Sequence, residues 1–334
     1  MANVCRWALR GLCAILAVLG AVVGGVSATF AADFSKDAVG TTGAQFLELP
    51  VGARAIAMGA VQGAAANDAT ALYYNPAGLA GIPGGSLALM HAAYFQEISY
   101  QYGALAQRLG SFGTLAVGFQ YLSPGKLTEI YNDGTPTGGS FTPSDLAATI
   151  GYGNSLENVD LGFSGKYIVS KIHASAKTYA ADFGIRIRLR RLAVAASAAN
   201  VGKGLKFHDK QENLPYTLRG GASLQLGNLL LAADAIFPRG AERVFAGGAE
   251  LALRPSDSFA VFGRGGYNSR TAASKLGGTA GLSAGGGIAI GGLSFDYAWS
   301  PFGDLGQAHR FSLTLNWGNP QPRRGGKKRV SRWE

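Results

Sequence analysis

The sequence predicts an all-β protein: a 14-stranded antiparallel transmembrane β-barrel whose lumen holds an N-terminal hatch, or plug, segment. Three observations lead to this fold class. Glycine supplies 50 of the 334 residues and charged residues only 15%, a composition that suits a sheet facing lipid better than a soluble enzyme. Apolar and polar residues alternate in one segment after another from Gly85 to Trp317. The connections between these segments are alternately tight and long, as in bacterial outer-membrane barrels.

Residues 1–31 have the features of a cleaved secretory signal peptide. Two arginines precede an apolar run over residues 12–26, which is followed by a small-residue cleavage site. The run is shorter than the roughly 18–20 residues that a membrane-spanning helix needs. Both cysteines, Cys5 and Cys13, lie in this segment, so we expect an exported chain without disulfides or a thiol nucleophile. An export signal followed by a barrel indicates the outer membrane of a Gram-negative-type cell.

Residues 32–82 form the predicted hatch, in the periplasm or the barrel lumen. The segment has no strand-length alternation and packs small residues around a few apolar ones. Asp68 is expected to cap a short helical turn over residues 69–73, and Asn75 a second turn with Pro76 at its first position. The hatch motif consists of Asn75, Pro76, Ala77 and Gly78.

Two roles are open to the apolar residues of the hatch. They either line a pocket for a hydrophobic ligand or anchor the hatch to the barrel wall, and anchoring is the favoured role. These residues are Phe46, Leu47, Leu49, Ile56 and Met58.

The predicted barrel covers residues 83–318. We expect fourteen strands, each near or above the 9–11 residues that a tilted strand needs to cross the apolar layer. The segments are 85–94, 99–109, 112–123, 144–154, 159–170, 177–189, 192–201, 214–226, 229–237, 242–254, 257–267, 275–290, 292–300 and 308–317. The last of them is the clearest, because Phe311, Leu313, Leu315 and Trp317 share one face.

The lengths of the connections indicate the orientation. Six tight turns each join an even-numbered strand to the next odd-numbered one, whereas most odd-to-even links are longer. With both chain ends in the periplasm, the longer links are external. Even the longest of them, over residues 123–143, is of modest length. A soluble β-sandwich gives no reason for such a sorting of loops.

Alternation also places a mixed set of charges on the inward faces. The set comprises Lys166, Asp182, Arg186, Arg188, Arg219, Asp234, Glu250, Arg264, Asp296 and Arg310. A lumen enclosed by fourteen strands is too wide for side chains alone to fill, so it needs water or a plug. Mixed charges favour internal ion pairs and docking of the hatch over a selective pore. A hydrated ladder without a substrate role is favoured over a ligand site.

The residues form no catalytic or metal-binding constellation. Residues 281–285, Gly-Leu-Ser-Ala-Gly, match a hydrolase pattern that requires a strand-to-helix turn, but here they lie among glycines between strands. The four histidines are scattered, so neither a metal nor a cofactor is expected. Much of the formal net charge of +10 comes from residues 319–334. We expect this tail to be disordered or to meet anionic lipid, and no nucleic-acid-binding face is indicated.

Two stretches carry a family resemblance. Residues 40–59, GTTGAQFLELPVGARAIAMG, and residues 67–79, NDATALYYNPAGL, closely resemble the PorV/PorQ family. That family looks like a branch of the FadL-type fourteen-stranded outer-membrane barrels, with which it shares an Asn-Pro-Ala hatch motif. The resemblance implies an accessory role in type IX secretion, in which the barrel receives secreted cargo from the translocon. FadL itself passes long-chain fatty acids through a hatch-gated barrel.

We therefore expect a non-enzymatic outer-membrane protein, surrounded by outer-membrane lipid. The family resemblance favours the hypothesis that it is an accessory, cargo-binding barrel of type IX-like secretion, with secreted cargo or translocon proteins as partners. The alternative is a FadL-like, hatch-gated transporter of hydrophobic small molecules. A structural barrel without a dedicated ligand is the third. The modest external loops and the chain beyond Trp317 depart from the family pattern.

Overall fold

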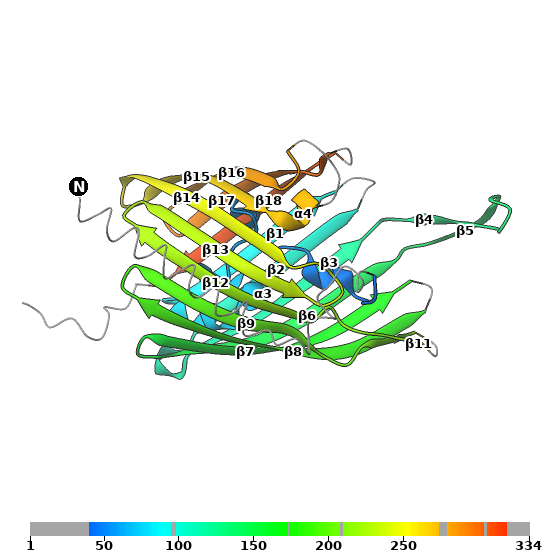
Figure 1. Cartoon of the computed structure of the whole chain (residues 1–334), viewed down its shortest axis with the longest axis horizontal. Helices are drawn as coiled ribbons and strands as arrows, with labels where there is room; N and C mark the ends of the chain where they lie inside the picture. Colours follow the sequence, from blue (N-terminus) through cyan, green and yellow to red (C-terminus); the bar gives the residue numbers. More distant parts are fainter. Residues whose placement is uncertain are drawn as a thin grey trace, which may run out of the picture.

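Fourteen strands form a closed antiparallel barrel (Figure 1), which confirms the predicted fold class. The structure is a computed structural model that describes residues 40–318 except 95–97, 173, 208–209, 274–278 and 304–305. The predicted signal peptide and the basic tail lie outside the described residues. In chain order the barrel strands are β1 (Gly85–Ala93), β2 (Ser99–Arg108), β3 (Thr114–Ser123), β6 (Ser144–Leu156), β7 (Val159–Lys171), β8 (Ser175–Leu189), β9 (Leu192–Gly202), β12 (Thr217–Leu226), β13 (Leu229–Pro238), β14 (Val244–Ser256), β15 (Phe259–Asn268), β16 (Leu282–Ile290), β17 (Leu293–Pro301) and β18 (Gln307–Trp317).

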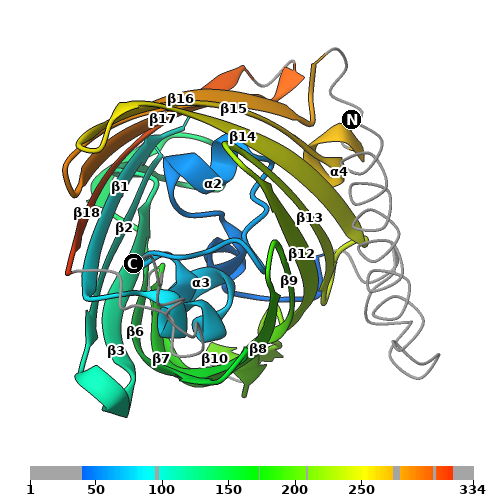
Figure 2. The ribbon, with the colours of Figure 1, turned by 90° about the vertical axis from the view of Figure 1, so that its left-hand side faces the viewer.

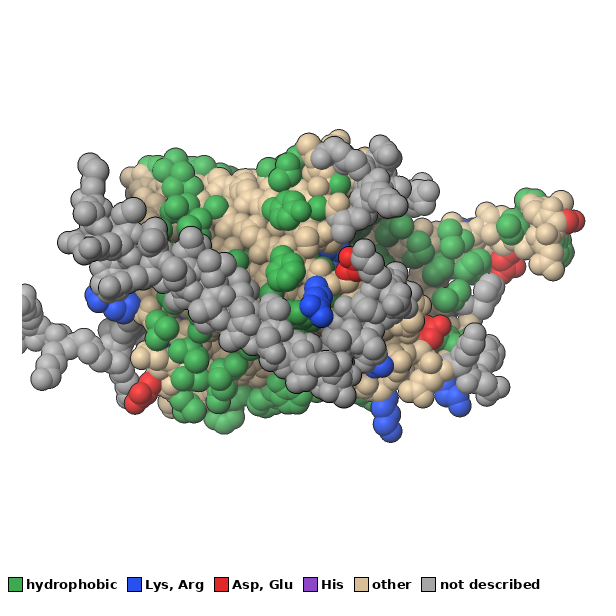
Figure 3. Space-filling model, viewed as in Figure 1, with side chains coloured by type: hydrophobic (Ala, Val, Ile, Leu, Met, Phe, Trp, Pro, Cys, Tyr) green, Lys and Arg blue, Asp and Glu red, His purple; other side chains and the backbone are tan. Residues whose placement is uncertain are grey.

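The seam that closes the ring, between β1 and β18, shows how alternation separates the two faces of the sheet. Leu315 pairs with Leu87 on β1 and with Leu293 on β17. Leu315 and Leu293 are 40% and 44% exposed, whereas Ser312 and Thr314 are buried. Figure 3 shows further apolar side chains on the outer surface. An apolar exterior around a polar interior suits a barrel in the outer membrane.

The two ends of the barrel differ. One end carries the tight turns and is called the turn end; the other carries the longer links and is called the loop end. At the loop end β4 (Leu127–Ile130) and β5 (Pro136–Phe141) form a hairpin that projects from the barrel (Figure 1). The smaller pair β10 (Leu205–Phe207) and β11 (Lys210–Glu212) and the helix α4 (Ser269–Ala273) also lie in links. The sequence did not predict these elements, because segments of three to six residues are too short for a clear period.

Two predicted strands are wrong at their starts by three residues or more. The segment 275–290 was expected to be extended throughout, but β16 begins at Leu282. Gly281 has a φ of 97°, a left-handed conformation that turns the chain into the strand. Likewise, β12 begins at Thr217 rather than at residue 214.

Residues 41–82 lie inside the ring of strands (Figure 2). Their helices are η3 (Gln45–Glu48), α2 (Ala53–Ala57), α3 (Ala71–Tyr74) and η4 (Pro76–Gly81). Helices of four to six residues are unstable in isolation, so packing against the wall must hold them. Val51, Ala57 and Leu79 are fully buried. No helix in the described part of the chain is long and apolar enough to cross a bilayer.

The two predicted caps have different outcomes. Asn75 accepts a hydrogen bond at Oδ1 from the Ala77 N–H at 3.0 Å and precedes Pro76 at the first position of η4, as predicted. Asp68 is not the N-cap of the helical turn that follows it: α3 begins at Ala71 and its N-cap is Thr70. The Asp68 carboxylate instead accepts from the Thr70 N–H at 2.9 Å, a local turn that competes with helix at this residue type.

Strand glycines let the plug approach the wall closely at two places, which we call the first and second glycine seats. A Cβ on any of these glycines would overlap the plug. In the first seat, on β6, β7 and β8, η4 and the Asn75 before it rest on Gly153, Gly162 and Gly184. In the second seat, on β14, β15 and β16, the end of α2 rests on Gly248, Gly266 and Gly285. Part of the high glycine content therefore serves plug packing.

Candidate functional site

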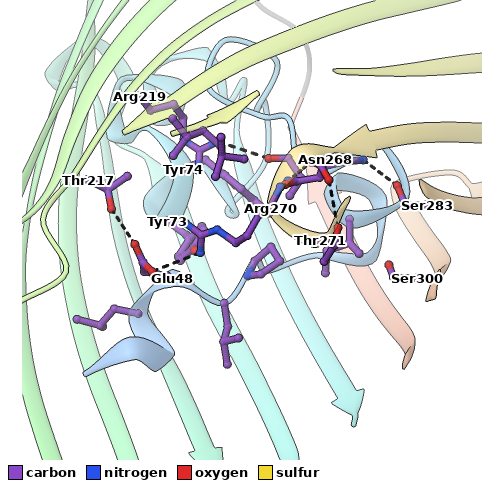
Figure 4. Close-up of a pocket in the computed structure, with 18 of the residues that line it drawn as sticks. Glu48, Tyr73, Tyr74, Thr217, Arg219, Asn268, Arg270, Thr271, Ser283 and Ser300 are labelled. Carbon is purple, nitrogen blue, oxygen red and sulfur yellow. Dashed lines mark hydrogen bonds and ion pairs between the residues drawn. The ribbon is translucent and has the colours of Figure 1, made fainter. Parts of the chain in front are cut away.

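A cavity of about 220 Å³ lies at the loop end of the lumen, between the plug and the wall (Figure 4). The plug forms one side of it through η3, the chain up to Ile56 and the rings of Tyr73 and Tyr74. The opposite side comes from the loop-end parts of β9, β12, β15, β16 and β18 and from α4. Seven or more segments that are far apart in the sequence thus meet around one space.

The predicted apolar hatch residues divide between the two roles that the sequence left open. Leu47, Leu49 and Ile56 line the cavity. Phe46 does not, because it packs with Ile168 and other wall residues. Met58 likewise packs with Val61 and the wall residues Leu230, Ala232 and Ala246. Leu47 shares the Phe46 cluster as well, so it both anchors the plug and faces the cavity.

Three of the four cations that line the cavity have carboxylate partners. Lys166 Nζ lies 3.0 Å from Asp182 Oδ2. Arg219 Nη1 lies 2.8 Å from Asp234 Oδ2. On α4, Arg270 Nη1 lies 3.3 Å from Glu48 Oε2 of the plug (Figure 4).

Glu48 is the carboxylate that lines the cavity itself, and it is held from two sides. The Thr217 hydroxyl donates to Glu48 Oε1 at 3.4 Å, opposite the contact with Arg270. Burial raises the pKa of Glu48, and the nearby Arg270 charge opposes that rise without cancelling it. The pair therefore connects a loop-end helix to the plug by a contact that depends on ionisation.

The fourth cation, Arg310 on β18, has no carboxylate partner among the described residues. Its side chain is almost fully buried, at 2% exposed. Nη2 donates to the Tyr94 hydroxyl at 3.0 Å, and the guanidinium lies over the rings of Tyr94 and Phe302 at 4.8 and 5.8 Å. Among the residues that the structure describes, Nε and Nη1 have no hydrogen-bond acceptor and the guanidinium forms no ion pair.

Nearer the turn end than the cavity, a charge network joins α2 of the plug to the wall strands β14, β15 and β17. Arg54 Nε and Arg264 Nε lie 2.8 and 2.7 Å from Glu250 Oε2. Arg264 Nη1 also lies 2.7 Å from Asp296 Oδ1. Arg54 was not among the predicted residues, because charges in the plug follow no alternation that would give their direction.

Two more wall charges hold the plug through its backbone. Asp234 accepts from the N–H groups of Gln62 and Gly63 at 3.1 and 3.0 Å. Arg186 donates from Nη1 to the Ala66 carbonyl at 2.7 Å and lies 2.9 Å from Asp160. These contacts agree with the expected pairing and hatch docking.

Arg188 departs from the rest of the predicted lumen set. It lies at the turn end with 42% of its side chain exposed, 2.9 Å from Asp160. It pairs with a carboxylate that Arg186 already neutralises, and its hydrogen bonds go to Ser155 and Glu157 rather than to the described residues of the plug. Its inward direction was predicted correctly, but its depth in the barrel was not.

The site residues that the sequence missed lie where strands end. Tyr94 follows β1, Phe302 follows β17 and Arg270 lies on α4. Periodicity gives no direction for side chains in links, so alternation could not assign Phe302 and Arg270 to the lumen. Tyr94 was the last residue of the predicted strand 85–94, on the same face as Met90 and Ala92, but it is uncharged and was not selected. The aromatic character of Tyr94 and Phe302 beside loop ends was the available signal.

The hydrolase-like pattern serves the plug instead of catalysis. Ser283 lies in β16, where its hydroxyl accepts from the Gly59 N–H at 3.0 Å and donates to the Ala57 carbonyl at 3.2 Å. This is a strand rather than the sharp strand-to-helix turn of such nucleophiles. Within the described ranges, no three His, Cys, Asp or Glu residues cluster with metal-binding spacing.

Comparisons with known proteins agree with the fold. Residues 20–139 match the family model described as Uncharacterised protein family (UPF0164), and no match was found among the curated proteins. The solved toluene transporter TodX of Pseudomonas putida is similar, with a TM-score of 0.54 and 12% identity over 79% of this chain and 96% of that chain. The monoaromatic hydrocarbon channel CymD gives a TM-score of 0.55 and 12% identity over 81% and 98% of the two chains. A FadL homologue of Pseudomonas aeruginosa gives 0.50 and 12% over 80% and 99%.

At this level of identity the likeness concerns the fold alone. The chain has the fold of FadL-like outer-membrane barrels, which supports a location in the outer membrane. The finer resemblance to PorV/PorQ depends on residues 40–59 and 67–79 and stays a prediction from the sequence.

Proposed function

We propose that this protein admits small hydrophobic molecules across the outer membrane, with residues 32–82 as the hatch of a barrel formed by residues 83–318. The observation that carries the proposal is the cavity at the loop end, which lies between the plug and the wall. Its lining combines apolar and aromatic side chains with hydroxyl, amide and charged groups. Pockets for small molecules have this composition. Similar folds belong to a toluene transporter and a monoaromatic hydrocarbon channel.

The plug gives the proposal a physical mechanism. Transfer of an apolar molecule from water into the cavity lowers the free energy. The plug, however, blocks its way to the turn end. The plug is held to the wall by the two glycine seats and by ion pairs such as Arg54 with Glu250. These contacts are non-covalent, so a limited displacement of the plug is the movement that passage requires.

The accessory role in secretion, which the sequence analysis placed first, is the second candidate function. It requires a surface for protein cargo, and no observation on the described loops favours one kind of cargo. The solved structures named above include transporters and channels of hydrocarbons, so uptake of small molecules is the stronger proposal.

Cross-linking the plug to the loop-end pair β10–β11 tests the mechanism. Gly43 hydrogen-bonds through its N–H to Asn213, and a Cβ on Gly43 would lie 3.1 Å from the Glu212 Cβ. A small shift brings the pair to the 3.5–4.5 Å of a disulfide. The double variant Gly43→Cys/Glu212→Cys therefore ties the plug at residue 43 to the β10–β11 pair, while the other end of the plug continues into β1.

Uptake of labelled toluene would be measured in Gram-negative cells that express the double variant, before and after reduction. We expect uptake to fall to the level of cells without the protein when the disulfide is formed, and to return on reduction. The two single-cysteine variants are the controls and should not respond to reduction. Wild-type uptake no faster than in cells without the protein would contradict the proposed function.

A further inference from the structure

Arg310 is the group in the cavity whose chemistry the proposed uptake of neutral hydrocarbons leaves unexplained. A buried cation without a counter-charge is costly, since burial removes water that nothing else replaces. The aromatic faces of Tyr94 and Phe302 and one hydroxyl compensate only in part. Two buried donor atoms, Nε and Nη1, are left without acceptors in the described part of the chain.

The other cations of the cavity act as internal controls. Lys166, Arg219 and Arg270 are each within 3.3 Å of a carboxylate. The other cations of the cavity are therefore neutralised by carboxylates, and among the described residues Arg310 is the exception. The described residues of the lining include four cations and one carboxylate, Glu48, so the cavity favours an occupant with negative charge.

The size of the cavity limits the rest of the occupant. An apolar cavity of about 150 Å³ is known to hold one benzene molecule. The cavity here, at about 220 Å³, has room for a single ring and a small substituent. The rings of Tyr73, Tyr74 and Tyr94 on its lining provide faces for such a ring.

We propose that the cavity binds a small carboxylic acid with about one aromatic ring, and that Arg310 binds its carboxylate. The inference deepens the proposed function and depends on it, because it names the substrate class for the same cavity. A slight rotation of the guanidinium on the Tyr94 ring would turn its unpartnered donors toward the ligand. An ion pair enclosed by aromatic side chains is stronger than the same pair in water.

Benzoate and toluene form a matched pair of probes, because they share a ring and differ mainly in the carboxylate. Binding of each to the purified full-length protein in detergent would be measured by calorimetry at pH 7, where benzoate is ionised. The variants are Arg310→Gln, which removes the charge, and Arg310→Lys, which keeps it. Arg188→Gln, which removes an exposed cation at the turn end, is the control.

We expect Arg310→Gln to raise the Kd for benzoate at least tenfold, the loss that follows from one charge-assisted hydrogen bond. Arg310→Lys should raise it less, and Arg188→Gln should leave it unchanged. The Kd for toluene should stay within about threefold in every variant, which also shows that each variant is folded.

Two other outcomes are distinct. Toluene binding without benzoate binding, or a benzoate Kd that is the same in wild type and Arg310→Gln, would overturn this inference and leave the proposed function standing. Binding of neither probe to the wild-type protein would count against the proposed function and this inference together.

Discussion

At the scale of single residues, ion pairing distinguishes structural charges from a candidate ligand-binding one. The charges that the sequence placed in the lumen mostly form networks, and several of these hold the plug. Glu250 is the centre of one network, because it accepts from both Arg54 and Arg264. Arg310 is also buried, but no carboxylate of the described residues pairs with it. A list of inward charges cannot separate these cases, since pairing depends on register across strands and on the path of the plug.

Replacing Glu250 with Gln should be strongly destabilising. The substitution removes the carboxylate that Arg54 and Arg264 share, so Arg54 keeps only Asp68 at 3.9 Å and Arg264 only Asp296. Broken buried pairs typically cost about 3–5 kcal/mol. Urea unfolding of the purified barrel would measure the change in the free energy of unfolding. Arg188→Gln is the matched control and should cost less than about 1 kcal/mol, because its side chain is 42% exposed. Equal effects of the two variants would contradict the network as described.

Glu48 should make stability depend on pH. Burial raises its pKa in the folded protein above the usual value, so the folded state binds a proton more readily than the unfolded state. The free energy of unfolding should therefore rise, relative to Glu48→Gln, as the pH falls from 7 toward the raised pKa. Parallel urea titrations of both proteins across this range would measure the difference. A wild-type protein that loses stability relative to the variant on acidification would indicate that pairing with Arg270 outweighs burial.

At the scale of elements, the plug and the wall are complementary because glycine removes side chains where the two touch. The first glycine seat receives η4 and the second receives the end of α2. Neither helix is long enough to be stable alone, so their conformation is selected by these surfaces. Alternation predicted the strands but not the glycine seats. A glycine weakens the strand pattern in the sequence, and its role in packing is known only when its neighbour in space is known.

Adjacent glycines of β15 test the second seat. A Cβ on Gly266 would overlap Met58 and Gly59, whereas a Cβ on Gly265 meets nothing within 4 Å. Gly266→Ala should lower the free energy of unfolding by about 1–3 kcal/mol, as overpacking does, and should make the plug more sensitive to protease. Gly265→Ala, its control, should change both little. The seat would be refuted if the two variants behaved alike.

At the scale of the whole molecule, the sequence predicted the barrel well and the cavity poorly. Strands such as β18 alternate over their full length, and lipid outside with polar groups inside imposes that period. The hairpin β4–β5 and the helix α4 are too short to show one. The cavity joins Glu48, Tyr94 and Arg310, which meet only after the ring has closed around the plug. No local sequence pattern predicts that residues so far apart in the chain lie around one cavity.

Removing the plug should change the conductance of the barrel. Fourteen strands enclose more space than side chains can fill, and residues 41–82 occupy the lumen. In planar bilayers, the intact protein should therefore conduct little, and a variant that lacks residues 41–80 should give large and unselective current steps. If the deletion prevents insertion, Arg54→Gln combined with Glu250→Gln offers a second route, because it loosens α2 and should produce brief openings. A deletion variant that inserts but conducts no better than the intact protein would show that the plug does not close the lumen.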